Sequence, residues 1–98
     1  MTINKKNIEL LEGFLDYLSK ERNFSKHTIR NYFIDLKQFS EFLYSHSTTS
    51  NFLNIDKSII QMYIQKCSKN NYSDKTLSRK VASIKSLFKF LMQNSLIE

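Results

Sequence analysis

The sequence predicts an all-α fold, a compact bundle of four or five helices. The chain of 98 residues contains one Gly and no Pro, the residues on which hairpins and tight turns usually depend. Hydrophobic residues make up 41% of it, which provides enough apolar side chains for one core. Apolar residues recur at three- and four-residue steps in four segments, the period of a buried helix face. A chain of this length is expected to form a single domain, 1–98.

The first half of the chain predicts two helices, over 5–20 and 26–45. The apolar positions expected to face the core in the first are Ile8, Leu11, Phe14 (or Leu15) and Leu18. Those of the second are Ile29, Tyr32, Phe33, Leu36, Phe39 and Leu43. A polar stretch, SHSTTSN, follows, and its Ser and Thr side chains favour local backbone bonds over helix.

The second half predicts two more helices, over 57–68 and 74–94. Asp56 is the expected N-cap of the shorter helix. Its expected inward residues are Ile60, Tyr63, Ile64 and Cys67. Those of the longer helix are Leu77, Val81, Ile84, Phe88 and Leu91.

Two stretches are nearly alike, NFSKHTIRNY (23–32) and NYSDKTLSRK (71–80), and each begins a predicted long helix. Ser25 and Ser73 are expected to cap these helices, since a serine hydroxyl can accept from the backbone N–H three residues on. An aromatic residue precedes each cap, and an aliphatic residue follows five positions after it, the spacing of a hydrophobic staple. The likeness therefore indicates one physical device used twice, and does not by itself indicate an internal duplication.

The charge distribution favours a polyanionic partner. The chain has 15 Lys and Arg against 9 Asp and Glu, a net charge of +6. On the last predicted helix, the face opposite Ile84 has no carboxylate from residue 75 to 97. Cations on one face repel each other unless phosphates neutralise them, so this face favours nucleic acid over plain solvent. The residues of this face are Lys75, Arg79, Ala82, Ser86 and Lys89, flanked by Ser78 and Lys85.

The outward face of the second predicted helix also carries nucleic-acid-binding side chains. Arg, Asn and Gln have the forked donors and acceptors that read base edges in a major groove. An apolar residue among them, Ile34, fits a thymine methyl or a partner domain, or is a single exposed apolar side chain. Asp35 and Glu41 make this helix less basic than the last one. The residues of this face are His27, Arg30, Asn31, Ile34 and Gln38.

No catalytic, metal or cofactor site is expected. The pattern HTIR (27–30) matches His-x-x-Arg, but the flanking sequence supplies no recognisable arrangement of a nucleophile and further cationic donors. The single Gly13 lies inside a predicted helix, so there is no glycine-rich phosphate loop. With one Cys and two His, no zinc site is expected. The chain shows neither a signal peptide nor a membrane-spanning run, and with its lone Cys67 a reducing cytoplasm is expected.

The run IELLEGFLDYLSKERNFSKHTIRNYFIDLKQFSEFL resembles the N-terminal helices of tyrosine recombinases of the phage-integrase type, in particular the bacterial Xer group. The resemblance rests on these positions: Phe14, Leu15, Tyr17, Leu18, Glu21, Arg22, Ser25, Thr28, Tyr32, Asp35, Leu36, Phe39, Phe42 and Leu43. The later run TLSRKVASIKSLFKFLMQNSLI resembles the last helix of the same domain. Its matching positions are Leu77, Arg79, Val81, Ala82, Ile84, Lys85, Leu87, Phe88, Phe90 and Leu91.

This resemblance implies a SAM-like core-binding domain, one half of a clamp around DNA, whose second and fourth helices meet the major groove near the crossover region. It implies double-stranded DNA and further recombinase protomers as partners. The family's catalytic domain, with its His-x-x-Arg box and nucleophilic Tyr, is absent from this chain, which is expected to be a non-catalytic fragment of a recombinase. The runner-up function is a helical protein-interaction module. The expected DNA-binding residues are Lys26, His27, Arg30, Asn31, Lys75, Ser78, Arg79, Lys85, Ser86 and Lys89.

Overall fold

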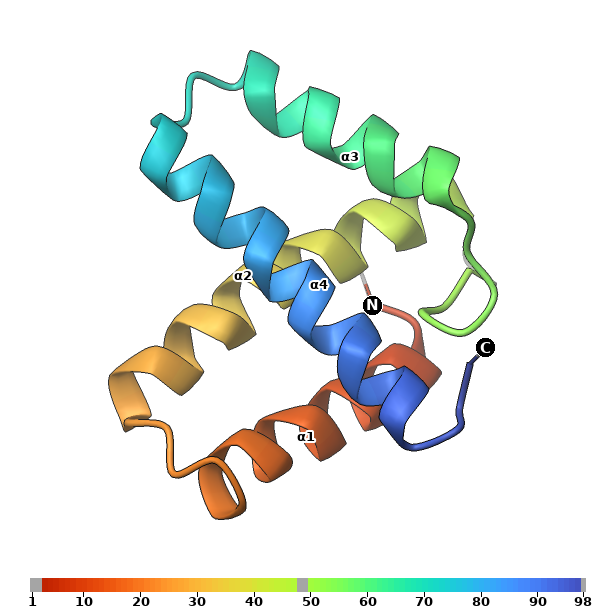
Figure 1. Cartoon of the computed structure of the whole chain (residues 1–98). Coiled ribbons are helices and arrows are strands. Elements are labelled where there is room, and N and C mark those ends of the chain that lie inside the picture. Colours follow the sequence, from red (N-terminus) through yellow and green to blue (C-terminus); the bar gives the residue numbers. More distant parts are fainter. Residues whose placement is uncertain (1–2, 48–49, 98) are drawn as a thin grey trace. The chain divides into compact units, whose positions relative to one another are not determined.

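Four amphipathic segments fold as four α-helices in a computed structural model, which describes residues 3–47 and 50–97. They are α1 (Lys5–Lys20), α2 (Lys26–His46), α3 (Lys57–Lys69) and α4 (Asp74–Gln93) (Figure 1). Each predicted helix is confirmed, with ends within a residue of the expected ones. No strand and no fifth helix occurs within the described residues.

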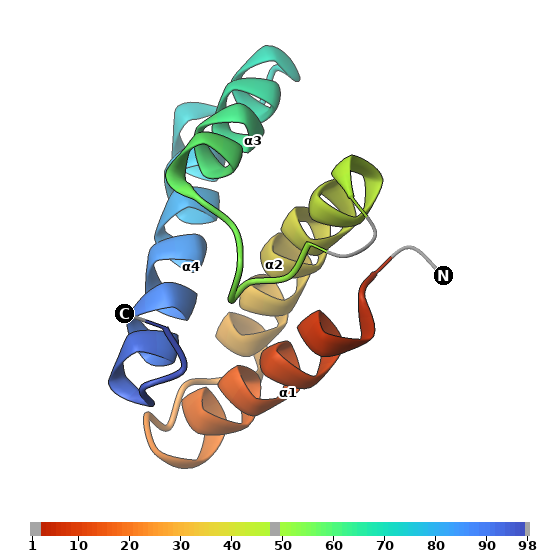
Figure 2. The same ribbon diagram turned by 90° about the vertical axis from the view of Figure 1, so that its right-hand side faces the viewer.

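The helices divide between two compact units, Met1–Phe52 with α1 and α2, and Leu53–Glu98 with α3 and α4. Within each unit the two helices pack against one another and are joined by a short connection, residues 21–25 in one and 70–73 in the other. Figure 2 shows the same pairing of α1 with α2 and of α3 with α4 from a second side.

The core of the first unit is formed by apolar residues at helical spacing. Leu11, Phe14 and Leu18 of α1 are buried, as predicted, and Leu10 joins them, while Ile8 and Leu15 are only half-buried. From α2, Leu36, Phe39 and Leu43 are fully buried, as predicted.

Phe33 does not belong to this core, because its side chain is 43% exposed. Two polar residues of α2, Asp35 and Ser40, are instead buried on the core-facing side. The Ser40 hydroxyl donates a 2.7 Å hydrogen bond to the Leu36 carbonyl, which satisfies it inside the core. The core-facing side of α2 predicted from apolar residues alone is therefore centred too close to Phe33.

A buried asparagine fixes the segment that follows α2. Asn7 of α1 is fully buried, and its Oδ1 accepts a hydrogen bond of 2.8 Å from the Phe52 backbone N–H. The Phe52 ring is stacked on Phe39, with ring centres 5.9 Å apart and an angle of 14° between the planes. Phe52 is therefore a core residue that the helical periods did not predict.

The buried side of α4 differs from the one that its apolar residues alone suggest. Tyr63 and Cys67 of α3 are buried as predicted, while Ile60 and Ile64 are half-buried. In α4 the predicted Ile84 and Leu91 are buried, but Leu77, Val81 and Phe88 are half-buried. Leu87, Ser83 and Lys80 take the remaining buried positions. The buried side of α4 therefore lies closer to Leu87 than predicted, and it includes a lysine and a small serine.

Candidate nucleic-acid interface

The helix starts that present the candidate interface have the same local geometry. Ser25 and Ser73 have almost identical backbone angles, φ −65° and ψ 157° against φ −64° and ψ 157°. In both, the serine Oγ accepts from the backbone N–H three residues on, at 3.2 Å. The same Oγ donates to the threonine hydroxyl at 3.0 Å. The two predicted caps are confirmed, and the repeated sequence builds a repeated structure.

The residues before each cap also correspond. Asn23 and Asn71 adopt the left-handed conformation, with φ of 52° and 62°, which asparagine tolerates better than most residues. The aromatic ring that follows contacts the residue eight positions further on. The Phe24 ring lies against Tyr32 with ring centres 6.0 Å apart, and the Lys80 Nζ lies 4.8 Å from the centre of the Tyr72 ring. The predicted staple partners Ile29 and Leu77 are half-buried.

The outward face of α4 carries the predicted basic residues at its surface. All of its predicted site residues are exposed except Ser86, which is half-buried. The only carboxylate of α4 is Asp74 in the first turn, where it faces the positive end of the helix dipole. The exposed members of this face are Lys75, Ser78, Arg79, Ala82, Lys85 and Lys89. We call these six residues and Ser86 the basic face of α4.

The outward face of α2 is more mixed. Lys26, His27 and Arg30 are exposed, whereas Asn31 is half-buried, so its amide group is less accessible than predicted. Ile34 is 38% exposed, which agrees with its predicted outward position, and it adjoins the exposed Phe33. Lys37, one turn beyond Phe33, is also exposed and was missed, because the predicted face was centred opposite Leu36.

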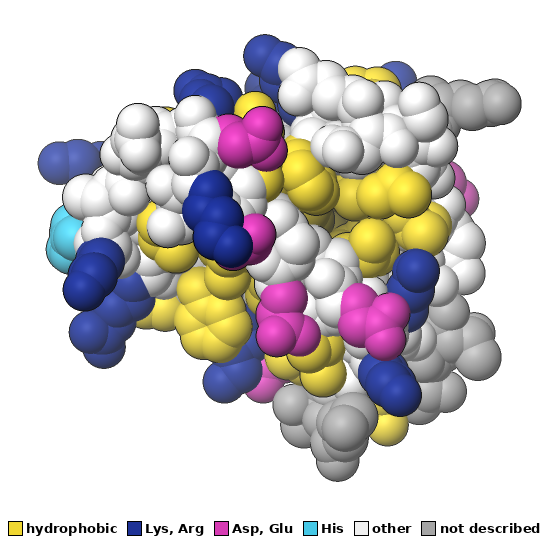
Figure 3. Space-filling view, turned by 90° about the horizontal axis from the view of Figure 1, so that it is seen from below, with side chains coloured by type: hydrophobic (Ala, Val, Ile, Leu, Met, Phe, Trp, Pro, Cys, Tyr) yellow, Lys and Arg dark blue, Asp and Glu magenta, His cyan; other side chains and the backbone are white. Residues whose placement is uncertain are grey.

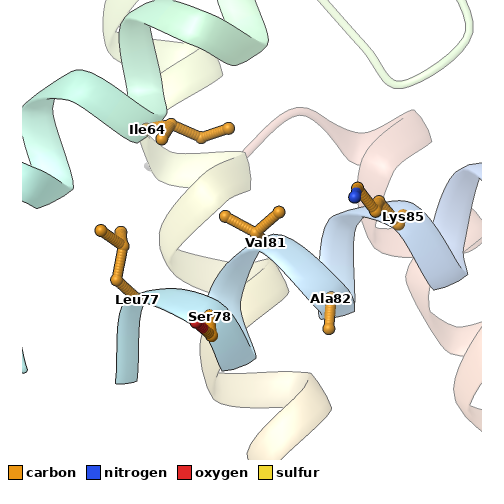
Figure 4. Close-up of a pocket in the computed structure, with 6 residues that line it drawn as sticks. All are labelled: Ile64, Leu77, Ser78, Val81, Ala82 and Lys85. Carbon is orange, nitrogen blue, oxygen red and sulfur yellow. The ribbon is translucent and has the colours of Figure 1, made fainter. Parts of the chain in front are cut away.

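An open groove of about 400 Å³ lies between α3 and α4 beside the basic face (Figure 4). Leu77 and Val81 point toward Ile64 of α3. Ser78, Ala82 and Lys85, which belong to the basic face, complete the lining. The basic face therefore combines ammonium groups with a shallow apolar surface.

The cap of α3 is the predicted one, and it affects the acidity of its carboxyl. Asp56 Oδ1 accepts from the Ser58 hydroxyl at 2.6 Å and from the Ile59 backbone N–H at 3.2 Å. These bonds, that of Ser58 first, hold the pKa of Asp56 below its ordinary value because they stabilise the charged form.

Surface charges of both signs appear in the view of Figure 3. Lys and Arg side chains lie along the left edge beside a histidine and also toward the right, and acidic side chains lie nearer the middle. On α1, Lys20 Nζ pairs with Asp16 at 3.2 Å, an exposed pair four residues apart. Among residues 3–47 and 50–97 no group of His, Cys, Asp and Glu could hold a metal ion. Within that same part of the chain, no helix has the length and apolarity to cross a bilayer.

These features define a class of protein: a SAM-like, all-helical domain that carries basic residues on its last helix. The profile of the family "Phage integrase, N-terminal SAM-like domain" matches residues 11–95. The chain belongs to this family, which confirms the resemblance seen in the sequence.

Bacterial tyrosine recombinases are similar to this chain. The tyrosine recombinase XerC of Halalkalibacterium halodurans is 33% identical over 87 residues, which cover 89% of this chain and 28% of that protein. The XerC protein of Listeria innocua is 32% identical over 89 residues, covering 91% of this chain and 29% of that protein. The chain thus spans less than a third of the length of these curated relatives. No solved structure matches it significantly.

Proposed function

We propose that this chain is the DNA-binding, core-binding domain of a site-specific tyrosine recombinase, and that it grips a recombination half-site through α2 and α4. The basic face of α4 is the observation that carries this proposal. Four cationic side chains, Lys75, Arg79, Lys85 and Lys89, are exposed on a helix that has no acid after Asp74. A solvated helix face usually mixes Glu with Lys for pair stabilisation, whereas a face that binds phosphates has no need of acids.

The proposed roles of the residues follow from their chemistry. The lysines of the basic face neutralise phosphates, while Ser78, Ala82 and Ser86 allow the helix to come close to a groove. On α2, Arg30 and Asn31 are the candidates for base edges, with Lys26 and His27 at the phosphates. The family profile spans α2 and α4, which supports one core-binding domain over residues 1–98.

Cutting and rejoining of DNA are not assigned to these residues. They would belong to a catalytic domain elsewhere in a longer protein, and the other recombinase protomers at the site would be partners of that protein. Because its substrate is chromosomal or mobile-element DNA, the expected location is the bacterial cytoplasm.

Fluorescence-anisotropy titration of the chain against duplex DNA tests the proposal. If about three to six phosphates are neutralised, log K falls with log salt concentration at a slope of roughly −3 to −5. Arg79→Ala and Lys89→Ala are expected to weaken binding without lowering the melting temperature, because both side chains are exposed. A flat salt response, or no binding at low salt, contradicts the proposal.

A second candidate function is a helical protein-interaction module. Two adjacent, large apolar side chains on α2, Phe33 and Ile34, are 43% and 38% exposed, and exposed apolar pairs are common at protein contacts. In that case Phe33→Ser would abolish binding to a protein partner, and amide chemical shifts would not respond to DNA. Shifts that follow DNA and cluster on α4 favour the first function.

A further inference from the structure

Lys80 is a lysine that the proposed DNA contacts do not use. It lies on α4, one residue after Arg79, but it is only 3% exposed, whereas the lysines of the basic face are exposed. Lysine is rarely buried to this extent, because its ammonium group must be compensated by nearby groups. We propose that Lys80 is a positioning residue: it holds the Tyr72 ring and thereby fixes the first turn of α4 for DNA binding. This inference rests on the proposed function.

The geometry around Lys80 carries the proposal. Its Nζ lies 4.8 Å from the centre of the Tyr72 ring, within the range of a cation–π interaction. Such an interaction is stronger when the cation is shielded from water, as it is here. Tyr72 is 39% exposed, so the buried ammonium of Lys80 gives a ring near the surface a fixed contact.

The position of Tyr72 explains why holding its ring fixes the helix start. Tyr72 stands between Asn71, whose φ is 62°, and Ser73, the N-cap of α4. The connection from α3 must therefore turn sharply and then align the Ser73 hydroxyl with the Thr76 N–H, 3.2 Å away. Lys75 and Arg79, two members of the basic face, lie in the first turns that follow.

The first unit provides an internal comparison. Phe24 precedes the cap of α2 as Tyr72 precedes the cap of α4, and its ring contacts the residue eight positions on, Tyr32. The two helix starts thus share both the cap and the contact that restrains the preceding ring. At the start of α2 the residue eight positions on is a neutral ring, and the Arg22 guanidinium also lies 5.1 Å from the centre of the Phe24 ring; at the start of α4 the residue eight positions on is a cation. The recurrence of the contact at the same spacing supports a role in the geometry of the helix start.

A positioning role makes a prediction that a direct phosphate contact does not. A buried ammonium neutralises no phosphate, so Lys80→Met should lower DNA affinity while leaving the salt slope unchanged. Removing a phosphate-binding lysine should instead reduce the slope by about 0.9. Lys75→Ala is the matched control, since Lys75 is exposed on the same helix.

The experiment measures DNA affinity and its salt slope by anisotropy for Lys80→Met, Tyr72→Leu, Tyr72→Phe and the Lys80→Met/Tyr72→Leu double variant. We expect each of the first two to lose roughly three- to tenfold in affinity, a loss of the size that one cation–π contact supplies. The double variant should lose no more than either single one. Tyr72→Phe keeps the ring and should restore wild-type binding. Additive losses, an unchanged affinity in Tyr72→Leu, or a reduced slope in Lys80→Met would overturn the proposal.

A second readout separates this inference from the proposed function. In wild-type protein the Lys80 side-chain protons should show an upfield ring-current shift in NMR spectra, which Tyr72→Leu removes and Tyr72→Phe preserves. This signature does not depend on DNA. If the shift is present but no variant or wild type binds DNA, the proposed function fails while the contact stands. If DNA binds and the shift is absent, the positioning role is wrong. Tyr72 is near the surface, so its variants remain informative even if Lys80→Met does not fold.

Discussion

Asn7 Oδ1 accepts a 2.8 Å hydrogen bond from the backbone N–H of Phe52, a residue 45 positions further along the chain. Both residues are buried, and this bond attaches the segment after α2 to the first helix. It also lets the Phe52 ring stack on Phe39. A buried polar side chain thus holds the segment after α2 against the core of the first unit.

Replacing this asparagine should be costly. Asn7→Leu leaves the buried Phe52 N–H without its acceptor, so the free energy of unfolding should fall by about 1 to 3 kcal/mol. Urea unfolding followed by circular dichroism measures the change. Gln61→Leu, an amide-to-leucine change at an exposed position of α3, is the control and should be nearly neutral. Equal effects of the two substitutions would show that the hydrogen bond does not stabilise the fold.

The rotation of α4 predicts which of two neighbouring residues matters more for stability. Leu87 is fully buried, whereas Phe88, which the sequence pattern placed in the core, is half-buried. Leu87→Ala should therefore cost about 2 to 5 kcal/mol, and Phe88→Ala should cost less in spite of the larger side chain that is removed. Thermal unfolding of both variants makes the comparison. A larger loss of stability in Phe88→Ala than in Leu87→Ala would mean that Phe88 lies in the core, as the apolar period predicted.

Gly13 should be replaceable with a gain in stability. It lies inside α1 at an exposed position, and a Cβ atom added there meets no other atom within 4 Å. Because glycine in a helix interior is about 1 kcal/mol less favourable than alanine, Gly13→Ala should raise the melting temperature. Gly13→Ser should raise it by a smaller amount, following helix propensity. A lower melting temperature for the alanine variant would contradict the free space around this position.

The Asp56 cap should make stability depend on pH. Its pKa is held below the ordinary value of 3.8, so the charged form is favoured in the folded chain. The resulting stabilisation is present above pH 3.8 and is lost as the pH falls through the lower, folded-state pKa. An NMR titration of the Asp56 carboxyl should give a midpoint below 3.8. In Asp56→Asn, which can still cap but cannot ionise, this part of the pH dependence should disappear.

The sequence was sufficient for the helices and for their starts, because caps and period are local properties. Ser25, Ser73 and Asp56 cap the helices as predicted, and the basic face of α4 is exposed as its spacing indicated. The errors concern polar groups inside the protein. Asp35 and Lys80 are buried, whereas Phe33 is exposed and Phe88 is half-buried, a distribution that no apolar period can reveal. The contact between Asn7 and Phe52 joins distant parts of the chain and has no local signal either.

If the basic face of α4 neutralises phosphates, a comparison of two variants at matched net charge should show it in the salt slope of DNA binding. One variant replaces Lys75, Lys85 and Lys89 of this face by Ala, and the other replaces Lys5, Lys6 and Lys20 of α1, which are also exposed. Both variants lose the same charge, and the salt slope of DNA binding is measured for each. We expect the first slope to fall in magnitude by about 2.7 and the second to stay at the wild-type value. Equal changes in the two slopes would instead show that net charge, and not the basic face of α4, governs DNA binding.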